Sequence, residues 1–144
     1  MNSLATDVLI TGVVVALLIT FTCGNGLTFF TEFRWSREAV VAGFLYYGYF
    51  FSELVKSNIR LAQIVISPSL PINPGIVKIR TELTSQMGRL MLANSITMTP
   101  GTLTVELDGE WLYVHWVTVE HEDIESATRH LAAGFERYLK VIYG

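Results

Sequence analysis

The first half of the chain holds two long apolar segments separated by a short polar stretch. Residues 8–31 form 24 consecutive positions without a charge, and the apolar run Val8–Phe30 covers 23 of them. About 20 apolar residues in a helix cross the hydrocarbon core of a bilayer. A cleaved signal peptide would need a basic N-terminal region, whereas the first seven residues carry only Asp7. We therefore predict a retained transmembrane helix.

The second apolar segment, Ala39–Val55, is interrupted only by Glu53, and its helical pattern continues to Ile66. Towards its end the helix becomes amphipathic, because Lys56 and other polar residues occupy one side and apolar residues another. A helix that begins fully apolar and ends amphipathic leaves the bilayer and lies against a neighbour. We predict a second transmembrane helix here.

Tyrosines and glycines distinguish this second helix. Tyr46, Tyr47 and Tyr49 lie near its middle, and tyrosines in such helices sit at the interface or hydrogen-bond to a neighbouring helix. Gly43 and Gly48 would allow another helix to approach closely. The pattern favours a helix with protein neighbours.

Glu53 is the one acid inside the second helix. A carboxylate in hydrocarbon is costly, so such a residue is a candidate for proton or ion transfer. The alternative is an interfacial glutamate paired with Lys56, three residues further on. Both interpretations stay open, and the structural pair is favoured.

The pattern changes after a proline-rich linker at residues 67–75. We predict a strand at 76–80, a helix from Thr84 or Ser85 to about Ile96, strands at 102–107 and 111–119, and a helix at 122–141. The expected fold class is α+β: a transmembrane helical hairpin over 1–66, the linker, and a small cytoplasmic β-α-β-β-α domain over 76–144.

Two turns of this domain have strong local signals. Asp108-Gly109 predicts a type I′ hairpin turn, with positive φ at both positions. After it, the apolar and aromatic run at 111–119 predicts a strand covered on both faces. The residues Thr99 to Thr102 predict a second turn, held by threonine hydroxyls that include that of Thr97.

Composition narrows the possible functions. Hydrophobic residues make up 51% and charged residues 16%, against about 25% charge in an ordinary soluble domain. The net charge of −3 argues against a nucleic-acid partner, which would require a basic surface. The single cysteine, Cys23, allows no internal disulfide and is expected to be a small buried hydrophobe.

The sequence contains no phosphate-binding loop, zinc-protease motif or nucleophile elbow. His115 lies in an aromatic strand, and His121 and His130 are nine residues apart, a poor spacing for metal ligands. Residues 106–125 hold seven acids without a Lys or Arg, which we assign to a solvated hairpin tip and a helix start. We expect no catalytic residue, cofactor, metal site or small-molecule substrate, and therefore no enzyme.

Two stretches nevertheless match a known family. The first runs from Glu53 to Ile59 (ELVKSNI) and continues through AQIVI to Pro68. The second, and more specific, runs from Leu92 to Val105 (LANSITMTPGTLTV) and is followed by LYVH at 112–115. Together they resemble the E subunit of Mrp-type multisubunit sodium/proton antiporters, over about 60% of the chain.

The resemblance implies an accessory, multi-pass subunit of a cytoplasmic-membrane complex, in contact with other integral membrane subunits and with lipid. The same subunit type in an Mrp-derived respiratory complex, coupled to a hydrogenase or a sulfur-reducing arm, is the alternative. Many relatives have three hydrophobic segments before the Glu-x-x-x-Ser-Asn stretch, and this chain has two. The candidate assembly or ion-path residues are Glu53, Lys56, Asn58, Asn94, Thr97, Thr99, Pro100 and Gly101.

Overall fold

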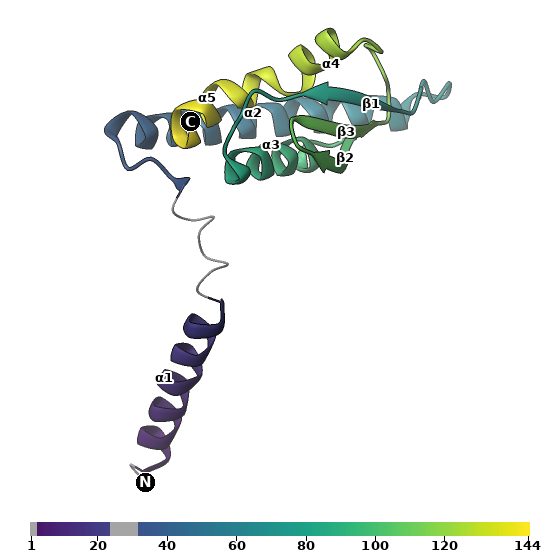
Figure 1. Ribbon diagram of the computed structural model, residues 1–144. Helices are drawn as coiled ribbons and strands as arrows, with labels where there is room; N and C mark the ends of the chain where they lie inside the picture. The colour runs from purple at the N-terminus through teal and green to yellow at the C-terminus, as the bar shows by residue number, and fades with distance from the viewer. Residues whose placement is uncertain (1–2, 24–31) are drawn as a thin grey trace. The chain divides into compact units, whose positions relative to one another are not determined.

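The computed structural model describes residues 3–23 and 32–144, and its contacts divide the chain into two compact units, 1–32 and 33–144 (Figure 1). The first unit contains α1 (Ser3–Cys23). The elements of the second unit are α2 (Arg37–Ile66), β1 (Gly75–Arg80), α3 (Gln86–Met98), β2 (Thr102–Asp108), β3 (Trp111–Trp116), α4 (Ile124–Leu131) and α5 (Ala133–Tyr143).

The prediction of two transmembrane helices, and with it the multi-pass topology, is wrong for the described chain. Among residues 3–23 and 32–144, no helix combines the length and the apolar content that crossing a bilayer requires. The uncharged part of α1 from Val8 to Cys23 is 16 residues, about 24 Å, against a core of about 30 Å. The uncharged stretch Ala39–Ser52 of α2 has 14 residues, about 21 Å. The remainder of the first predicted span, 24–30, lies outside the described residues.

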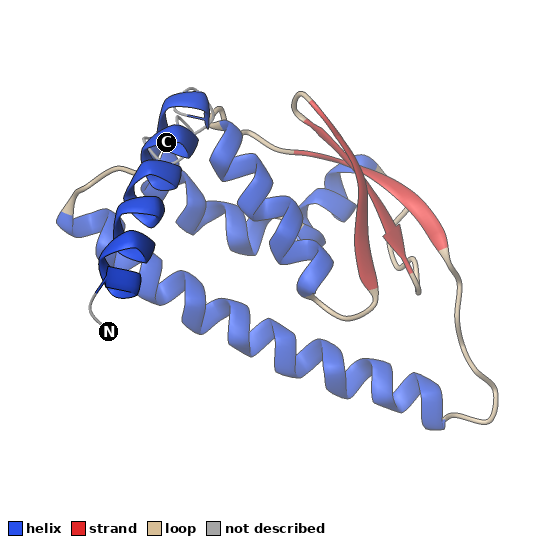
Figure 2. Ribbon diagram, turned by 90° about the horizontal axis from the view of Figure 1, so that it is seen from below, coloured by secondary structure: helices blue, strands red, loops and turns tan. Residues whose placement is uncertain are grey.

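α2 is a layer of the α+β unit. It begins after the N-cap Ser36, whose hydroxyl accepts from the Ala39 amide, and it runs the length of this unit (Figure 2). Its inner face packs on α5, where the ring centroids of Phe135 and Tyr49 lie 5.1 Å apart. Tyr46 hydrogen-bonds to Ser95 of α3 at 2.5 Å, as the pattern predicted for a tyrosine facing a neighbouring helix.

The close helix approach occurs at a glycine other than those predicted. A Cβ added at Gly43 or Gly48 would meet nothing within 4 Å. On α5, by contrast, a Cβ at Gly134 would overlap the hydroxyl end of the Tyr49 ring. Only a residue without a side chain leaves room for the Tyr49 ring in this position, so Gly134 lets the ring pack against α5.

The three strands form an antiparallel sheet in the order β1-β3-β2. The register of β2 shifts between Thr104 and Glu106, which leaves Val105 without a partner in β3. Burial alternates along β3, with Leu112, Val114 and Trp116 buried and the residues between them half-buried. The expectation of a strand covered on both faces is therefore wrong, since one face of β3 is only partly covered.

The hairpin between β2 and β3 is confirmed, but its turn is shifted by one residue. Asp108 pairs with Trp111, so the two loop residues are Gly109 and Glu110. Of these two, Gly109 alone has a positive φ, 58°. The predicted type I′ turn is wrong, because it requires positive φ at both loop positions; a glycine at the first position alone is what type II′ requires.

The final predicted helix is two helices. α4 begins after Asp123, whose carboxylate accepts from the Ser126 amide at 2.8 Å, and the helix breaks at Ala132, with φ −110° and ψ −41°. After the break, α5 begins at Ala133 and buries Phe135 and Leu139 in the core. The observed order is thus β-α-β-β-α-α.

Candidate functional site

A cleft of about 150 Å³ opens between α2, the α3–β2 turn and the segment from β3 to α5. Five of the eight predicted site residues line it: Glu53, Lys56, Thr99, Pro100 and Gly101. They reach it from two elements more than 40 positions apart in the chain. Its polar lining also includes Arg60, Glu120 and His130, which the sequence did not single out as site residues.

On the α2 wall, Glu53 and Lys56 form the ion pair that the spacing predicted. The Lys56 ammonium donates to the Glu53 carboxylate at 2.8 Å, and the glutamate side chain is 28% exposed. This hydrogen bond raises the pKa of Lys56. The pKa of the neighbouring Tyr49 hydroxyl is also raised, first by burial and then by the charge of Glu53. The pairing interpretation is confirmed, whereas a role in ion transfer stays a prediction.

The turn on the next wall is held by threonine hydroxyls, as predicted. Thr99 donates to the Ser95 carbonyl at 2.8 Å, which extends the hydrogen bonding of α3 past its end. Thr102 donates to the carbonyls of Ile96 and Thr99, at 2.6 and 2.8 Å. Gly101, with a φ of 96°, allows the chain to reverse direction between α3 and β2. These bonds give the turn a fixed shape at the edge of the cleft.

The other three predicted residues do not line the cleft. The Asn58 amide donates to the Leu54 carbonyl at 2.7 Å on the exposed side of α2. Asn94 is exposed on α3. Thr97 is exposed, and its hydroxyl accepts from the Thr104 amide, which ties α3 to β2. Thr97 therefore supports the same turn from outside.

Glu120 links the α2 wall to α4. One carboxylate oxygen lies 3.3 Å from Arg60, and the other lies 3.9 Å from Nε2 of His130. Burial lowers the pKa of His130, although the charge of Glu120 opposes this shift. A lowered pKa favours the neutral imidazole, whose free nitrogen can accept a proton or a metal ion.

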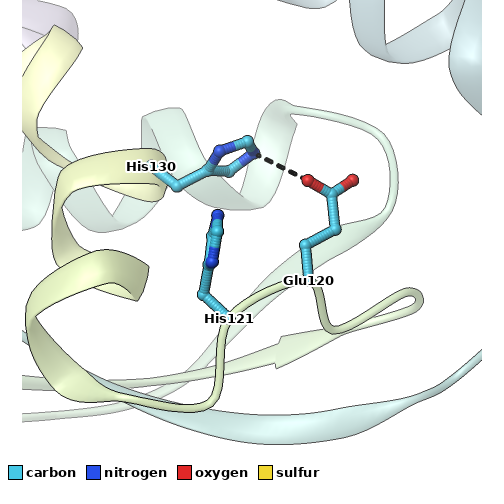
Figure 3. A group of neighbouring side chains, drawn as sticks. All are labelled: Glu120, His121 and His130. Atoms are coloured by element: carbon cyan, nitrogen blue, oxygen red, sulfur yellow. Dashed lines mark ion pairs between the residues drawn. The ribbon is translucent and has the colours of Figure 1, made fainter.

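His121 completes a cluster with Glu120 and His130, in which the ligand atoms all lie within 4.8 Å of one another (Figure 3). The spacing of nine residues concealed this arrangement, because the chain passes from the end of β3 into α4 and returns along that helix. The ring of Trp116 stacks on that of His130, with centroids 5.1 Å apart. No local sequence signal reports this contact.

Comparison with known proteins places the chain among antiporter subunits. The family model described as Na⁺/H⁺ ion antiporter subunit (MNHE) matches residues 1–142. The E subunit of the Na⁺/H⁺ antiporter of Alkalihalophilus pseudofirmus is 35% identical over 135 residues, which are 92% of this chain and 81% of that protein. The E subunit of the Na⁺/H⁺ antiporter of Bacillus subtilis is 37% identical over 95 residues, 65% of this chain and 59% of that protein.

A solved structure agrees with these relatives. A chain of the membrane-bound sulfane sulfur reductase, an archaeal respiratory membrane complex, superposes with a TM-score of 0.68 at 39% identity. The match covers 76% of this chain and 68% of that chain. The resemblance inferred from the two sequence stretches is confirmed, and the chain belongs to the family of Na⁺/H⁺ antiporter E subunits.

Proposed function

We propose that this chain is an accessory subunit of a multisubunit Na⁺/H⁺ antiporter complex in the cytoplasmic membrane, where it supports assembly and ion transport without catalysing a reaction. The match to the antiporter-subunit family over residues 1–142 supports this role. One structural observation carries it: a wide apolar surface on α2 that is exposed in the chain by itself.

This surface, the outer face of α2, runs along the helix opposite the residues that pack on α5. Its large apolar side chains are between 44% and 77% exposed: Val40, Val41, Phe44, Leu45, Tyr47, Phe51, Val55 and Ile59. Contiguous exposed apolar surface of this kind marks an interaction site, because leaving it in water is unfavourable. The occupants we propose are the other membrane subunits of the complex, together with lipid.

α1 supports the same conclusion by itself. Every described side chain from residue 6 to residue 22 is exposed, including the apolar ones. A helix that is apolar on all sides needs apolar surroundings. In an assembled complex, partner subunits and lipid would provide them.

The predicted site residues fit an assembly role. Glu53 and Lys56 are paired with each other, and the threonine hydroxyls of the α3–β2 turn are occupied by backbone carbonyls. We propose that this turn, with Pro100 and Gly101 at its tip, presents a fixed shape to a partner. A Thr99→Ala change would then lower the amount of complex before it lowered the activity of each assembled complex.

Two matched valines test the outer face of α2. Val41 on α2 is 58% exposed and Val105 on β2 is 57% exposed, so the same change to glutamate adds one charge at equal exposure. We expect Val41→Glu to reduce co-purification of the other subunits at least tenfold, because it would place a charge in an apolar contact. Val105→Glu, the control, should leave co-purification within about twofold. Equal recovery with both variants would contradict the proposal.

The alternative setting is an Mrp-derived respiratory complex, and the likeness to the archaeal sulfane sulfur reductase chain favours it. The same subunit type would serve both, because the redox chemistry would lie on other chains. Mass spectrometry of the proteins that co-purify in mild detergent separates the two settings. Antiporter subunits alone support the first, and hydrogenase-like or sulfur-reductase subunits in stoichiometric amounts support the second.

We further propose that residues 76–144 face the cytoplasm. Asp108 lies exposed beside the hairpin turn, so Asp108→Cys in a Cys23→Ser background gives a single thiol for labelling. A membrane-impermeant maleimide should label this thiol in inside-out vesicles and leave it unlabelled in right-side-out vesicles. The reverse pattern would place the domain on the opposite side.

A further inference from the structure

Three side chains that the proposed function does not use converge at the cleft, and two of them, Glu120 and His130, line it. Glu120 and His121 lie in the connection between β3 and α4, and His130 lies near the end of α4. Figure 3 shows the His121 ring and the Glu120 carboxylate both directed towards the His130 ring. Their ligand atoms all lie within 4.8 Å of one another.

Two imidazole nitrogens and one carboxylate oxygen are a ligand set suited to late first-row divalent metals. Zn²⁺ binds histidine nitrogen and carboxylate oxygen at about 2.0–2.2 Å, so ligand atoms in tetrahedral geometry lie about 3.3 Å apart. The His130 Nε2–Glu120 oxygen distance is 3.9 Å, and the widest separation in the cluster is within 4.8 Å. Side-chain rotation that moves these atoms by about 1.5 Å at most would bring the three ligands to bonding distance.

The neighbouring residues hold two of these side chains in place by ring stacking and by an ion pair. Trp116, itself 5% exposed, stacks on the His130 ring with an interplanar angle of 26° and also contacts the His121 ring. Arg60 holds one oxygen of Glu120 at 3.3 Å and leaves the other facing His130. This division of the carboxylate keeps one oxygen available as a metal ligand.

We propose that Glu120, His121 and His130 bind one divalent metal ion, with Zn²⁺ as the preferred ion. Three protein ligands leave a fourth position for water or for a group from a partner subunit. The bound ion would tie the connection after β3 to α4, and so stiffen the wall of the cleft that faces α2. This inference does not depend on the proposed function, because it rests on the ligand geometry alone.

Metal titration of the full chain tests the site. The protein, purified with a histidine-free affinity tag and stripped with EDTA, is titrated with Co²⁺, whose visible absorption reports tetrahedral coordination. We expect one equivalent to bind and Zn²⁺ to displace it. His121→Gln and His130→Gln should each weaken binding at least tenfold. His115→Gln is the matched control, because His115 lies on β3 outside the cluster.

A second measurement guards against misfolded variants. The circular dichroism spectrum of each variant without metal should match that of the unchanged chain. Glu120→Gln, which keeps the side-chain shape, gives a third ligand variant. Zn²⁺ should raise the melting temperature of the unchanged chain and of His115→Gln, but not that of the ligand variants. Absence of stoichiometric metal binding, or an equal loss of metal affinity in His115→Gln, would overturn the site. The cluster would then be only a stack of aromatic rings beside the Arg60–Glu120 ion pair.

Discussion

The two faces of α2 are both apolar, yet they have opposite environments. The inner face, represented by Ala39, Ala42 and Tyr46, is between 0% and 6% exposed and packs within its own unit. The outer face is between 44% and 77% exposed. The composition of a single helix therefore does not tell whether its apolar side chains pack inside the same chain or face a partner or lipid. On the inner face, the Tyr46 hydroxyl has a hydrogen-bond partner in α3, Ser95.

Substitutions on the two faces should accordingly change different properties. A change on the inner face should lower the free energy of unfolding of the chain itself. A change on the outer face should leave that free energy nearly unaltered and act on association, as proposed for Val41.

The largest loss of stability is expected where α2 and α5 are closest. Gly134→Val would place a Cβ in overlap with the Tyr49 hydroxyl oxygen, so the tyrosine or the helix must move. Overpacking of this kind costs about 1–3 kcal/mol, and we expect the upper end because two ring carbons of Tyr49 would also be closer than 3 Å. Denaturant unfolding of the full chain measures it.

The control for this prediction is a double variant. In a Tyr49→Ala background the obstacle is gone, so Gly134→Val should cost at least about 1 kcal/mol less than it does alone. If the two substitutions lowered the free energy of unfolding additively, the Tyr49 ring would not be what restricts the size of the side chain at residue 134. The separation between the faces would then lose its strongest support.

An intermediate effect is expected at the inner-face tyrosine. Tyr46 and Ser95 are 5% and 2% exposed, and Ser95 donates to the Met91 carbonyl, so the Tyr46 hydroxyl is the donor in their shared bond. Tyr46→Phe removes this donor and should cost about 1–1.5 kcal/mol. Tyr47→Phe is the matched control, because Tyr47 is 57% exposed on the outer face and should change stability by less than about 0.5 kcal/mol.

The same tyrosine gives a test by pH. Burial raises the pKa of Tyr46, so above about pH 10 the unfolded chain loses this proton before the folded chain does. The unfolded state then binds fewer protons, and stability falls as the pH rises. Tyr46→Phe should reduce the slope of this fall. An unchanged slope would indicate that the Tyr46 hydroxyl is not held in the buried site.

These contrasts explain what the sequence can and cannot predict. Interactions within a few residues were correctly predicted: the Glu53–Lys56 pair, the start of α3 at Ser85, one of the two predicted positions, and the threonine-held turn before β2. Each depends on the geometry of one helix or turn. The order of the first helix and three strands after the linker followed from the same local patterns.

Interactions across long separations were not predicted. The packing of α2 on α5 joins residues about 85 positions apart, and the apolar pattern of α2 is equally consistent with lipid. The break at Ala132 has no Gly or Pro at that position to announce it. Glu120, His121 and His130 meet only because the chain turns back along α4, which the spacing of nine residues cannot show.

The smallest effect is expected at Glu53, which lines the cleft on α2. Its carboxylate pairs with Lys56 at 2.8 Å, and the lysine side chain is 65% exposed, so solvent screens the pair. An exposed pair of this kind contributes little to stability. Glu53→Gln keeps the shape and an oxygen acceptor for Lys56, and we expect ion exchange in inside-out vesicles to stay within about twofold at matched complex content. Glu82→Gln, which removes an acid paired with Lys140 outside the cleft, is the control. A loss of more than about tenfold for Glu53→Gln alone, equal to about 1.4 kcal/mol in the barrier, would assign Glu53 to the ion path, because only a titrating or cation-binding role distinguishes the acid from its amide.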